Sequence, residues 1–152
     1  MIYLKMKKII TTSEKETLEF AGNMAEKIKT GKVFALLGDL GAGKTVFVRG
    51  FLRGLGYKGR VNSPTFVIMK IYDIKKNPQI KQVCHIDAYR LKSAADLEAI
   101  GALEYFKRKD TVVFVEWAER ISKLLLKNTS YIHIESQKEN TRVLKIKKGP
   151  KK

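Results

Sequence analysis

The chain has 152 residues with a formal net charge of +16, and 44% of its residues are hydrophobic. This length and composition are typical of a single globular domain that buries a core of its own. No apolar run approaches the roughly 20 residues of a membrane span, and no apolar stretch long enough for a signal peptide follows the N-terminus, so we expect a cytoplasmic protein without membrane association.

The cysteine content limits the kinds of site that the chain can form, and the charge favours certain kinds of partner. Cys84 is the only cysteine, which excludes a disulfide framework and a thiolate metal cluster. A large positive charge favours polyanionic partners, such as nucleic acid, nucleotides or acidic proteins. The lysines are spread along the chain, however, so a solvated basic surface is the alternative to direct contact with nucleic acid. We expect one domain over residues 1–152, in which residues 145–152 form a basic tail that is a candidate for disorder.

The first half of the chain predicts a strand, a helix, a buried strand and a second helix. Residues 7–10 are expected to form the first strand, and the helix after it has Thr12 or Ser13 as its N-cap and Gly31 as its end. If Ser13 is the cap, Glu16 is placed for a capping box. KVFALL at 32–37 is a continuous apolar run, as in a buried parallel strand, and TVFVRGFLRGL at 45–55 predicts the helix that follows.

The second half predicts a mixture of strands and helices. Two strands are expected at 63–74 and 79–87, joined by a hairpin at KKNP. A further strand is expected at 111–117, and two more at 130–136 and 141–147 are joined by a hairpin at QKEN. The expected helices are 94–106 and 118–127. Parallel strands crossed by helices, with antiparallel additions, predict an α/β fold whose mixed, mostly parallel sheet is flanked by helices.

The sequence GDLGAGKT at 38–45 fits the phosphate-binding pattern G-x-x-x-x-G-K-[ST]. Its glycines allow the backbone to curl so that successive amides face one anion, and the following helix adds its positive N-terminal end. Lys44 is placed to contact the β- and γ-phosphates, and the Thr45 hydroxyl to ligate Mg²⁺. The cofactor-binding residues predicted in this loop are Asp39, Leu40, Gly41, Ala42, Gly43, Lys44 and Thr45.

Two acidic residues follow apolar runs, as do the carboxylates that complete phosphate-loop sites. Asp87 ends VCHID and Glu116 ends VVFVE, and either can hold Mg²⁺ directly or through water; the alternative is a strand-end carboxylate that meets solvent. Thr65, in SPTF, lies in the region that forms a switch in GTPases, where a threonine senses the γ-phosphate through Mg²⁺; a proline turn that enters a strand is the alternative there. His85 is interpreted as a hydrogen-bonded core histidine. Because no N-K-x-D sequence occurs, ATP is the expected nucleotide.

GDLGAGKT, SPTF, HIDAYRL and VEWAER occur in this order, and the combination resembles the TsaE family. These are small bacterial ATPases of tRNA threonylcarbamoyladenosine biosynthesis, and the resemblance runs from TTSEKET to TRVLKI. It implies a P-loop NTPase-type fold and ATP with Mg²⁺ as cofactors. It also implies action with the TsaB–TsaD pair, which transfers a threonylcarbamoyl group to tRNA; the ATPase supports that pair between turnovers and reaches tRNA through the complex.

The resemblance also carries roles over to residues of this chain. Lys44 and the loop amides would hold the phosphates, and Thr45 and Glu116 would hold Mg²⁺, with Asp87 as a further metal candidate. Lys44, Asp87, Glu116 and Thr65 form the predicted catalytic set. The TTSEKET segment would contact the nucleotide base through one of Thr11, Thr12 or Ser13, of which Thr12 is taken as the site residue. Arg142 is a weaker candidate for the nucleotide edge.

A different class of function uses the same loop. In a small-molecule kinase, Asp87 would act as the base that accepts the proton of an acceptor hydroxyl. The longest candidate insert for binding such an acceptor is the segment 94–106. A module that binds nucleotide without turnover is a third alternative.

Overall fold

A computed structural model describes residues 5–125 and 127–149 of the chain. Its elements in chain order are β1 (Met6–Thr11), α1 (Glu14–Glu26), β2 (Lys32–Leu37), α2 (Lys44–Gly54), β3 (Met69–Asp73), β4 (Gln82–Asp87), α3 (Ala94–Ala99), the 3₁₀ segment η1 (Leu103–Lys107), β5 (Thr111–Glu116), the 3₁₀ segment η2 (Ala118–Leu124), β6 (Ser130–Lys138) and β7 (Thr141–Lys147).

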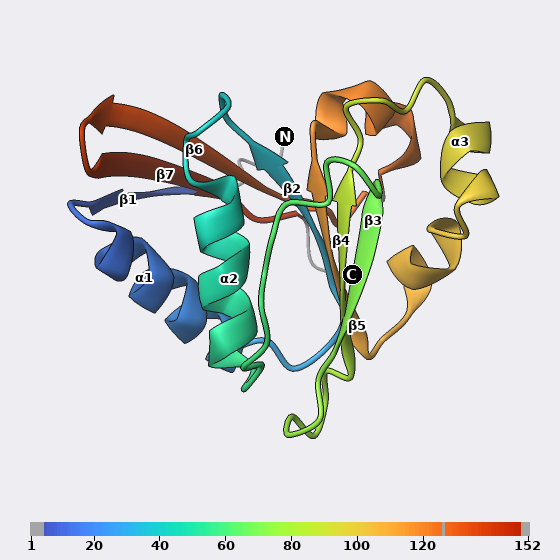
Figure 1. Ribbon diagram of the computed structural model, residues 1–152, viewed down its shortest axis with the longest axis horizontal. Helices are drawn as coiled ribbons and strands as arrows, with labels where there is room; N and C mark the ends of the chain where they lie inside the picture. The colour runs from blue at the N-terminus through green and yellow to red at the C-terminus, as the bar shows by residue number, and fades with distance from the viewer. Residues whose placement is uncertain (1–4, 126, 150–152) are drawn as a thin grey trace.

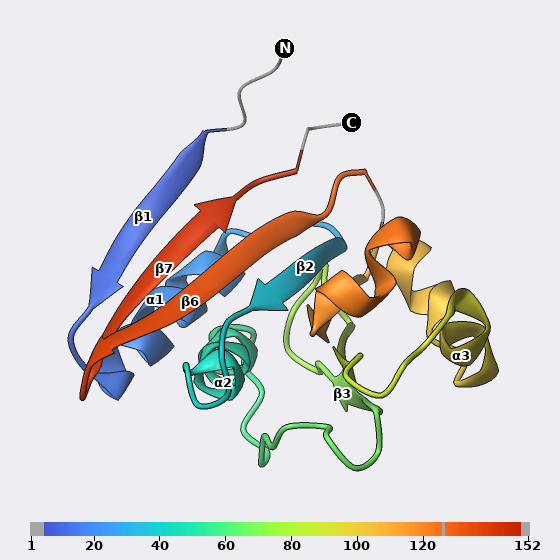
Figure 2. The same cartoon turned by 90° about the horizontal axis from the view of Figure 1, so that it is seen from above.

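The strands form one seven-stranded sheet in the order β1-β7-β6-β2-β5-β4-β3. The neighbours β6, β2, β5 and β4 are parallel, while β1, β7 and β6 pair antiparallel at one end and β3 pairs antiparallel with β4 at the other. Figure 2 shows β1, β7, β6 and β2 side by side. The prediction of a mixed α/β sheet flanked by helices is confirmed, and only β3 and β7 run against the direction of the other strands.

Both faces of the sheet are covered. The helices α1 and α2 pack on one face, and α3, η1 and η2 pack on the other (Figure 1). Phe114 of β5 lies at the centre of the first core, where its ring stacks on Phe34 at 5.3 Å between centroids and meets Phe51 of α2 edge-on at 4.9 Å. This packing fixes α2, and with it the loop that precedes α2, against the middle of the sheet.

Glycines allow α1 and α2 to approach closely. A Cβ atom added to Gly54 would lie 2.4 Å from the carbonyl oxygen of Gly22, and one added to Gly50 would lie 2.5 Å from the carbonyl oxygen of Leu18. At such separations the two backbones touch directly, and any larger residue would push the helices apart. The position of α2 is therefore set from the sheet and also from α1.

Three predicted elements differ in the structure. The helix predicted at 94–106 is broken, because Gly101 adopts a left-handed φ of 71° and ends α3, after which η1 begins. The strand predicted at 63–74 starts only at Met69, because the amides of Val67 and Ile68 both donate to the Pro64 carbonyl in a turn. The helix predicted at 118–127 is a 3₁₀ segment that is interrupted at Ile121, whose φ of −128° is not helical; residue 126 lies outside the described residues.

The structure also settles how α1 begins and how far β7 extends. Ser13 is the N-cap of α1, and its hydroxyl accepts a hydrogen bond from the Glu16 amide at 3.1 Å. The Glu16 carboxylate accepts the return bond from the Thr12 amide, one residue earlier than in a standard capping box. At the C-terminus, β7 extends through Lys147, so residues 145–147 of the predicted tail belong to the sheet; residues 150–152 lie outside the described residues.

Candidate nucleotide site

The phosphate-loop sequence connects β2 to α2, the position that its function requires. Gly38, Gly41 and Gly43 have φ angles of 144°, 80° and 108°, a region that L-residues with side chains rarely adopt. At Gly38 an added Cβ would also lie 2.4 Å from the carbonyl oxygen of Ile134 on β6. The glycines of the motif are therefore required by the backbone path of this loop, and Thr45, partly buried, follows at the start of α2.

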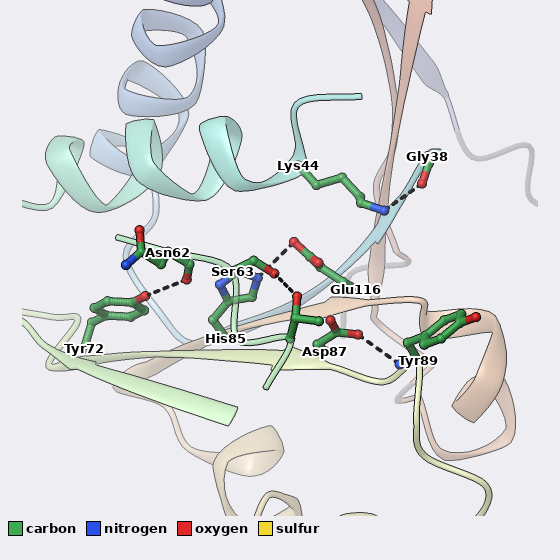
Figure 3. A network of polar contacts seen from close by, with 10 residues as sticks. Gly38, Lys44, Asn62, Ser63, Tyr72, His85, Asp87, Tyr89 and Glu116 are labelled. Carbon is green, nitrogen blue, oxygen red and sulfur yellow. Dashed lines mark hydrogen bonds and ion pairs between the residues drawn. The ribbon is translucent and has the colours of Figure 1, made fainter. Parts of the chain in front are cut away.

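Lys44 folds back over its own loop. Its Nζ atom donates a 2.7 Å hydrogen bond to the Gly38 carbonyl (Figure 3). The same atom lies 4.7 Å from the centroid of the Trp117 ring. The residue is only 7% exposed. Within residues 5–125 and 127–149, Lys44 forms no ion pair with a carboxylate. A nearly buried ammonium group without a counter-ion is costly, so this arrangement is suited to an anion.

Asp87 and Glu116 meet at the carboxyl ends of adjacent parallel strands. The two residues are register partners between β4 and β5, and they are 6% and 4% exposed. Side chains alternate between the faces of a strand, and Glu116 follows Phe114 by two residues, so both carboxylates lie on the sheet face that α2 covers. One Asp87 oxygen accepts a hydrogen bond from the Tyr89 amide at 3.0 Å. The fold thus brings together the two acidic residues that the sequence selected.

His85 lies on the same face of β4 and contacts Glu116. The distance between His85 Nε2 and Glu116 Oε1 is 3.2 Å, and the histidine side chain is completely buried. The interpretation of His85 as a hydrogen-bonded core residue is confirmed. The sequence did not indicate that its partner would be the carboxylate at the end of the next strand.

Thr65 lies in an exposed turn. Its hydroxyl oxygen is 2.8 Å from that of Ser63, and in the described part of the chain no hydrogen bond joins Thr65 to the phosphate loop, Asp87 or Glu116. Phe66, next to it, is 88% exposed, and the Arg90 guanidinium lies 5.8 Å from the Phe66 ring centroid. Thr65 and Phe66 thus belong to a surface segment whose own contacts are with neighbours in that segment and with Arg90.

Arg142 and Thr12 have contacts within the protein. Arg142 Nε donates to the Ala42 carbonyl of the phosphate loop at 2.8 Å, and its Nη1 atom donates to carbonyls of the β6–β7 turn. The amide and hydroxyl of Thr12 are both bonded to the Glu16 carboxylate. Beside the loop is a small hollow lined by Glu14, Thr17, Gly43, Val46, Asn140 and Arg142. Gly43 and Arg142 are among the residues that the sequence analysis selected, whereas Asn140 and Val46 are not.

Comparison with known proteins identifies the family. The profile described as "Threonylcarbamoyl adenosine biosynthesis protein TsaE" matches residues 11–144. The chain belongs to the TsaE family. Its members take part in tRNA threonylcarbamoyladenosine biosynthesis, and the matched residues include the phosphate loop, Asp87, Glu116 and Arg142.

Individual relatives agree with this assignment. The chain is 42% identical to TsaE of Bacillus subtilis over 122 residues, which cover 80% of this chain and 73% of the relative. It is 35% identical to TsaE of Rickettsia typhi over 137 residues, which cover 90% and 91% of the two chains. Among solved structures, YdiB of Bacillus subtilis superposes with a TM-score of 0.79 at 32% identity, covering 99% of this chain and 90% of that one.

A hydroxyl group and two carboxylates are the oxygen groups that this site offers to a metal ion. No cluster of three or more His, Cys, Asp or Glu that could hold a metal occurs in the described part of the chain. Mg²⁺ usually keeps several waters and takes one or two carboxylates together with phosphate oxygens. Thr45, Glu116 and Asp87 supply that kind of incomplete ligand set. Among the described helices, none has the length and apolar character needed to cross a membrane.

Proposed function

We propose that the chain binds ATP with Mg²⁺ in its phosphate loop and hydrolyses the nucleotide in association with the TsaB–TsaD pair, in the cytoplasm. The observation that supports this most directly is Lys44: an almost buried ammonium group, in a glycine-shaped loop, whose only described hydrogen bond is to the Gly38 carbonyl. An ATP phosphate would supply the missing anion.

Each residue of the site has a role in this proposal. Lys44 and the amides of residues 39–45 bind the phosphates, and Lys44 exchanges the Gly38 carbonyl for phosphate oxygens. Thr45 and Glu116 hold Mg²⁺, with Asp87 beside them as a direct or water-mediated ligand. The metal ion, when bound, neutralises charge on the transferring phosphoryl group. Thr65 senses the γ-phosphate from the exposed turn, and Thr12 and Arg142 lie on the nucleoside side of the loop.

The exposed surface around the site favours a partner-dependent activity. Leu40 in the phosphate loop is 92% exposed, and Phe66 and Val67 in the turn after α2 are 88% and 58% exposed. Exposed large apolar side chains on segments next to a binding loop are candidates for contact with a partner protein. We therefore expect the TsaB–TsaD pair to cover this region, and tRNA to be reached through that complex.

The alternative of a small-molecule kinase has less support. The segment available for an acceptor site, 94–106, consists of the six-residue helix α3, a short connection and most of η1. Leu97 and Phe106 of this segment are buried in the second core. A segment committed to the core in this way has little freedom to act as a lid or to bind a second substrate.

The test is phosphate release from Mg-ATP by the pure chain, first alone and then with the TsaB–TsaD pair. We expect slow release alone and a strong increase with the pair, both abolished when Mg²⁺ is chelated. Rapid release that is indifferent to the pair would contradict the proposal. In that case small acceptor molecules would be screened, and ADP formation coupled to one phosphorylated product would identify the chain as a kinase.

A further inference from the structure

His85 is a polar group at the site for which the proposed function gives no role. Its ring is completely buried and its Nε2 atom lies 3.2 Å from Glu116 Oε1. Its other nitrogen, Nδ1, is also buried and has no hydrogen-bond partner among the described residues. Figure 3 shows the Glu116 carboxylate between His85 on one side and Lys44 on the other.

The contact follows from the register of the sheet. His85 pairs with Phe114, and Asp87 pairs with Glu116, so His85 and Glu116 are diagonal neighbours on one face of two parallel strands. Cross-strand neighbours at this offset are within reach when the side chains are long. The contact is thus set by the pairing of two buried parallel strands, and a shift in their register would also disturb the core residues beside it.

The surroundings of the ring select one hydrogen position. A proton on Nε2 is donated to the Glu116 carboxylate and leaves Nδ1 as a bare acceptor. A proton on Nδ1 instead would bury an N–H group without an acceptor and place the Nε2 lone pair against a carboxylate oxygen. A proton on Nε2 is therefore the arrangement that the geometry favours.

We propose that His85 is a positioning residue that holds Glu116 Oε1, so that Oε2 is presented to the metal side of the site. An unrestrained glutamate side chain samples several rotamers, and groups that fix a metal-binding carboxylate typically change metal affinity or activity about 10- to 100-fold when they are replaced. His85 itself touches neither nucleotide nor metal in this proposal. The inference rests on the proposed Mg-ATP function, since Glu116 needs a fixed orientation only if it has a ligand to hold.

The first experiment reads the hydrogen position directly and requires no nucleotide. The chain has two histidines, and His133, whose side chain is 44% exposed, serves as the internal reference. A long-range ¹H–¹⁵N spectrum of the imidazole rings, assigned with His133→Gln, should show the His85 proton on Nε2. A spectrum in which Nε2 of His85 carries no proton would overturn the proposal.

The second experiment separates positioning from general stability. Trp117, the single tryptophan of the chain and the neighbour of Glu116, provides a fluorescence signal for titrating Mg²⁺ into protein with a non-hydrolysable ATP analogue. His85→Leu, which removes the donor, should raise the half-saturating Mg²⁺ concentration about 10- to 100-fold while nucleotide affinity without Mg²⁺ is unchanged. His85→Gln, which can place an amide N–H near the Nε2 position, should recover most of the loss.

Val83→Ala is the matched control, because Val83 is buried on the same face of β4, two residues from His85. It should lower the melting temperature without changing the Mg²⁺ requirement. Equal Mg²⁺ requirements in His85→Leu and the wild type, or equal increases in His85→Leu and Val83→Ala, would overturn the positioning role. If the wild-type chain binds the analogue without any Mg²⁺ dependence, the proposed function is contradicted instead. The hydrogen position of His85 tests the contact with Glu116 separately, because that measurement needs no nucleotide.

Discussion

Lys44 and Glu116 carry opposite charges at the site, and their surroundings predict different consequences of removing each. Lys44→Ala deletes the ammonium group that the loop holds ready for phosphate, so nucleotide affinity should fall about 10- to 100-fold, the value of one or two charge-assisted hydrogen bonds. Glu116→Ala leaves the loop and Lys44 intact and should spare most of the binding. Both variants should lose phosphate release, about 100-fold or more.

Nucleotide titration of the two variants, beside phosphate release with the TsaB–TsaD pair, checks this division of roles. Equal losses of nucleotide affinity in Lys44→Ala and Glu116→Ala would show that Glu116 contributes to binding as much as to metal placement. In that case the separation of the site into a phosphate half and a metal half would be wrong.

Arg142 illustrates how a residue that the sequence places at the nucleotide edge also has contacts within the protein. It was a candidate for the nucleotide edge, but its guanidinium donates to the Ala42 carbonyl and to the β6–β7 turn. We expect Arg142→Ala to destabilise the nucleotide-free protein by about 1–2 kcal/mol through the lost hydrogen bonds of a charged, partly buried group. Arg142→Lys should restore little, because an ammonium group cannot reproduce the geometry of the guanidinium.

Urea denaturation without nucleotide distinguishes the two roles of Arg142. A residue that anchors the loop lowers stability in the absence of ligand, and nucleotide affinity falls as a consequence. A residue that only contacts the nucleotide leaves the free protein unchanged. If nucleotide-free Arg142→Ala is as stable as the wild type but binds ATP more weakly, Arg142 acts only at the nucleotide edge, as the sequence indicated.

At the scale of elements, apolar patterns in the sequence predicted the sheet and the two longer helices, α1 and α2. They thereby also placed the phosphate loop and the two acidic residues at strand ends. Because parallel strands end at one edge of a sheet, Asp87 and Glu116 could be expected at the same edge from sequence alone, although not as neighbours. The contact of Arg142 with Ala42 joins residues separated by 100 positions, and that of His85 with Glu116 depends on the order of strands. Neither contact leaves a periodic pattern in the sequence.

The elements that were misjudged were those in which local chemistry competes with a periodic pattern. The apolar spacing of 94–106 continues across Gly101, but the left-handed conformation of that glycine ends the helix. Ile68, a β-branched residue with a φ of 69°, interrupts an apolar run that otherwise has the composition of a strand. Positive φ at a branched residue is uncommon, and sequence patterns give it no weight.

The start of α1 gives a prediction about pH. Hydrogen bonds from the Thr12 amide and then from the Thr12 hydroxyl lower the pKa of Glu16. A carboxyl group whose pKa is lower in the folded state contributes stability above its unfolded pKa, about 4.3, and this contribution disappears as the pH falls through the folded value. Wild type should therefore be more stable than Glu16→Gln at pH 7, and the difference should shrink toward pH 3.

Urea midpoints of both proteins at the two pH values measure this difference, which should be small because Glu16 is exposed. Ser13→Ala is the control, since it removes the other half of the cap without removing a titrating group and should cost about 1 kcal/mol. A constant gap between wild type and Glu16→Gln across this pH range would show that the hydrogen bonds do not depend on the charge of the carboxylate.

At the scale of the whole molecule, most of the positive charge is not neutralised by the ion pairs of the described residues. The chain carries 31 lysines and arginines against 15 acidic residues, and the ion pairs between side chains in the described ranges are mostly exposed ones, such as Lys15 with Glu19 and Arg108 with Asp110. Dispersed surface lysines attract phosphates of any sequence and carry no means of reading bases.

We therefore expect the isolated chain to bind RNA weakly and without sequence preference. An unmodified tRNA that is a substrate of the pathway and an unrelated RNA of equal length should give equal affinities, and the logarithm of each should fall linearly with the logarithm of salt concentration. Fluorescence anisotropy from about 50 to 200 mM KCl measures both slopes, over the range where such binding falls steeply. A preference for the substrate tRNA that persists at the higher salt would mean that this chain reads RNA itself. It would then contribute to substrate choice, which the proposal assigns to its partners.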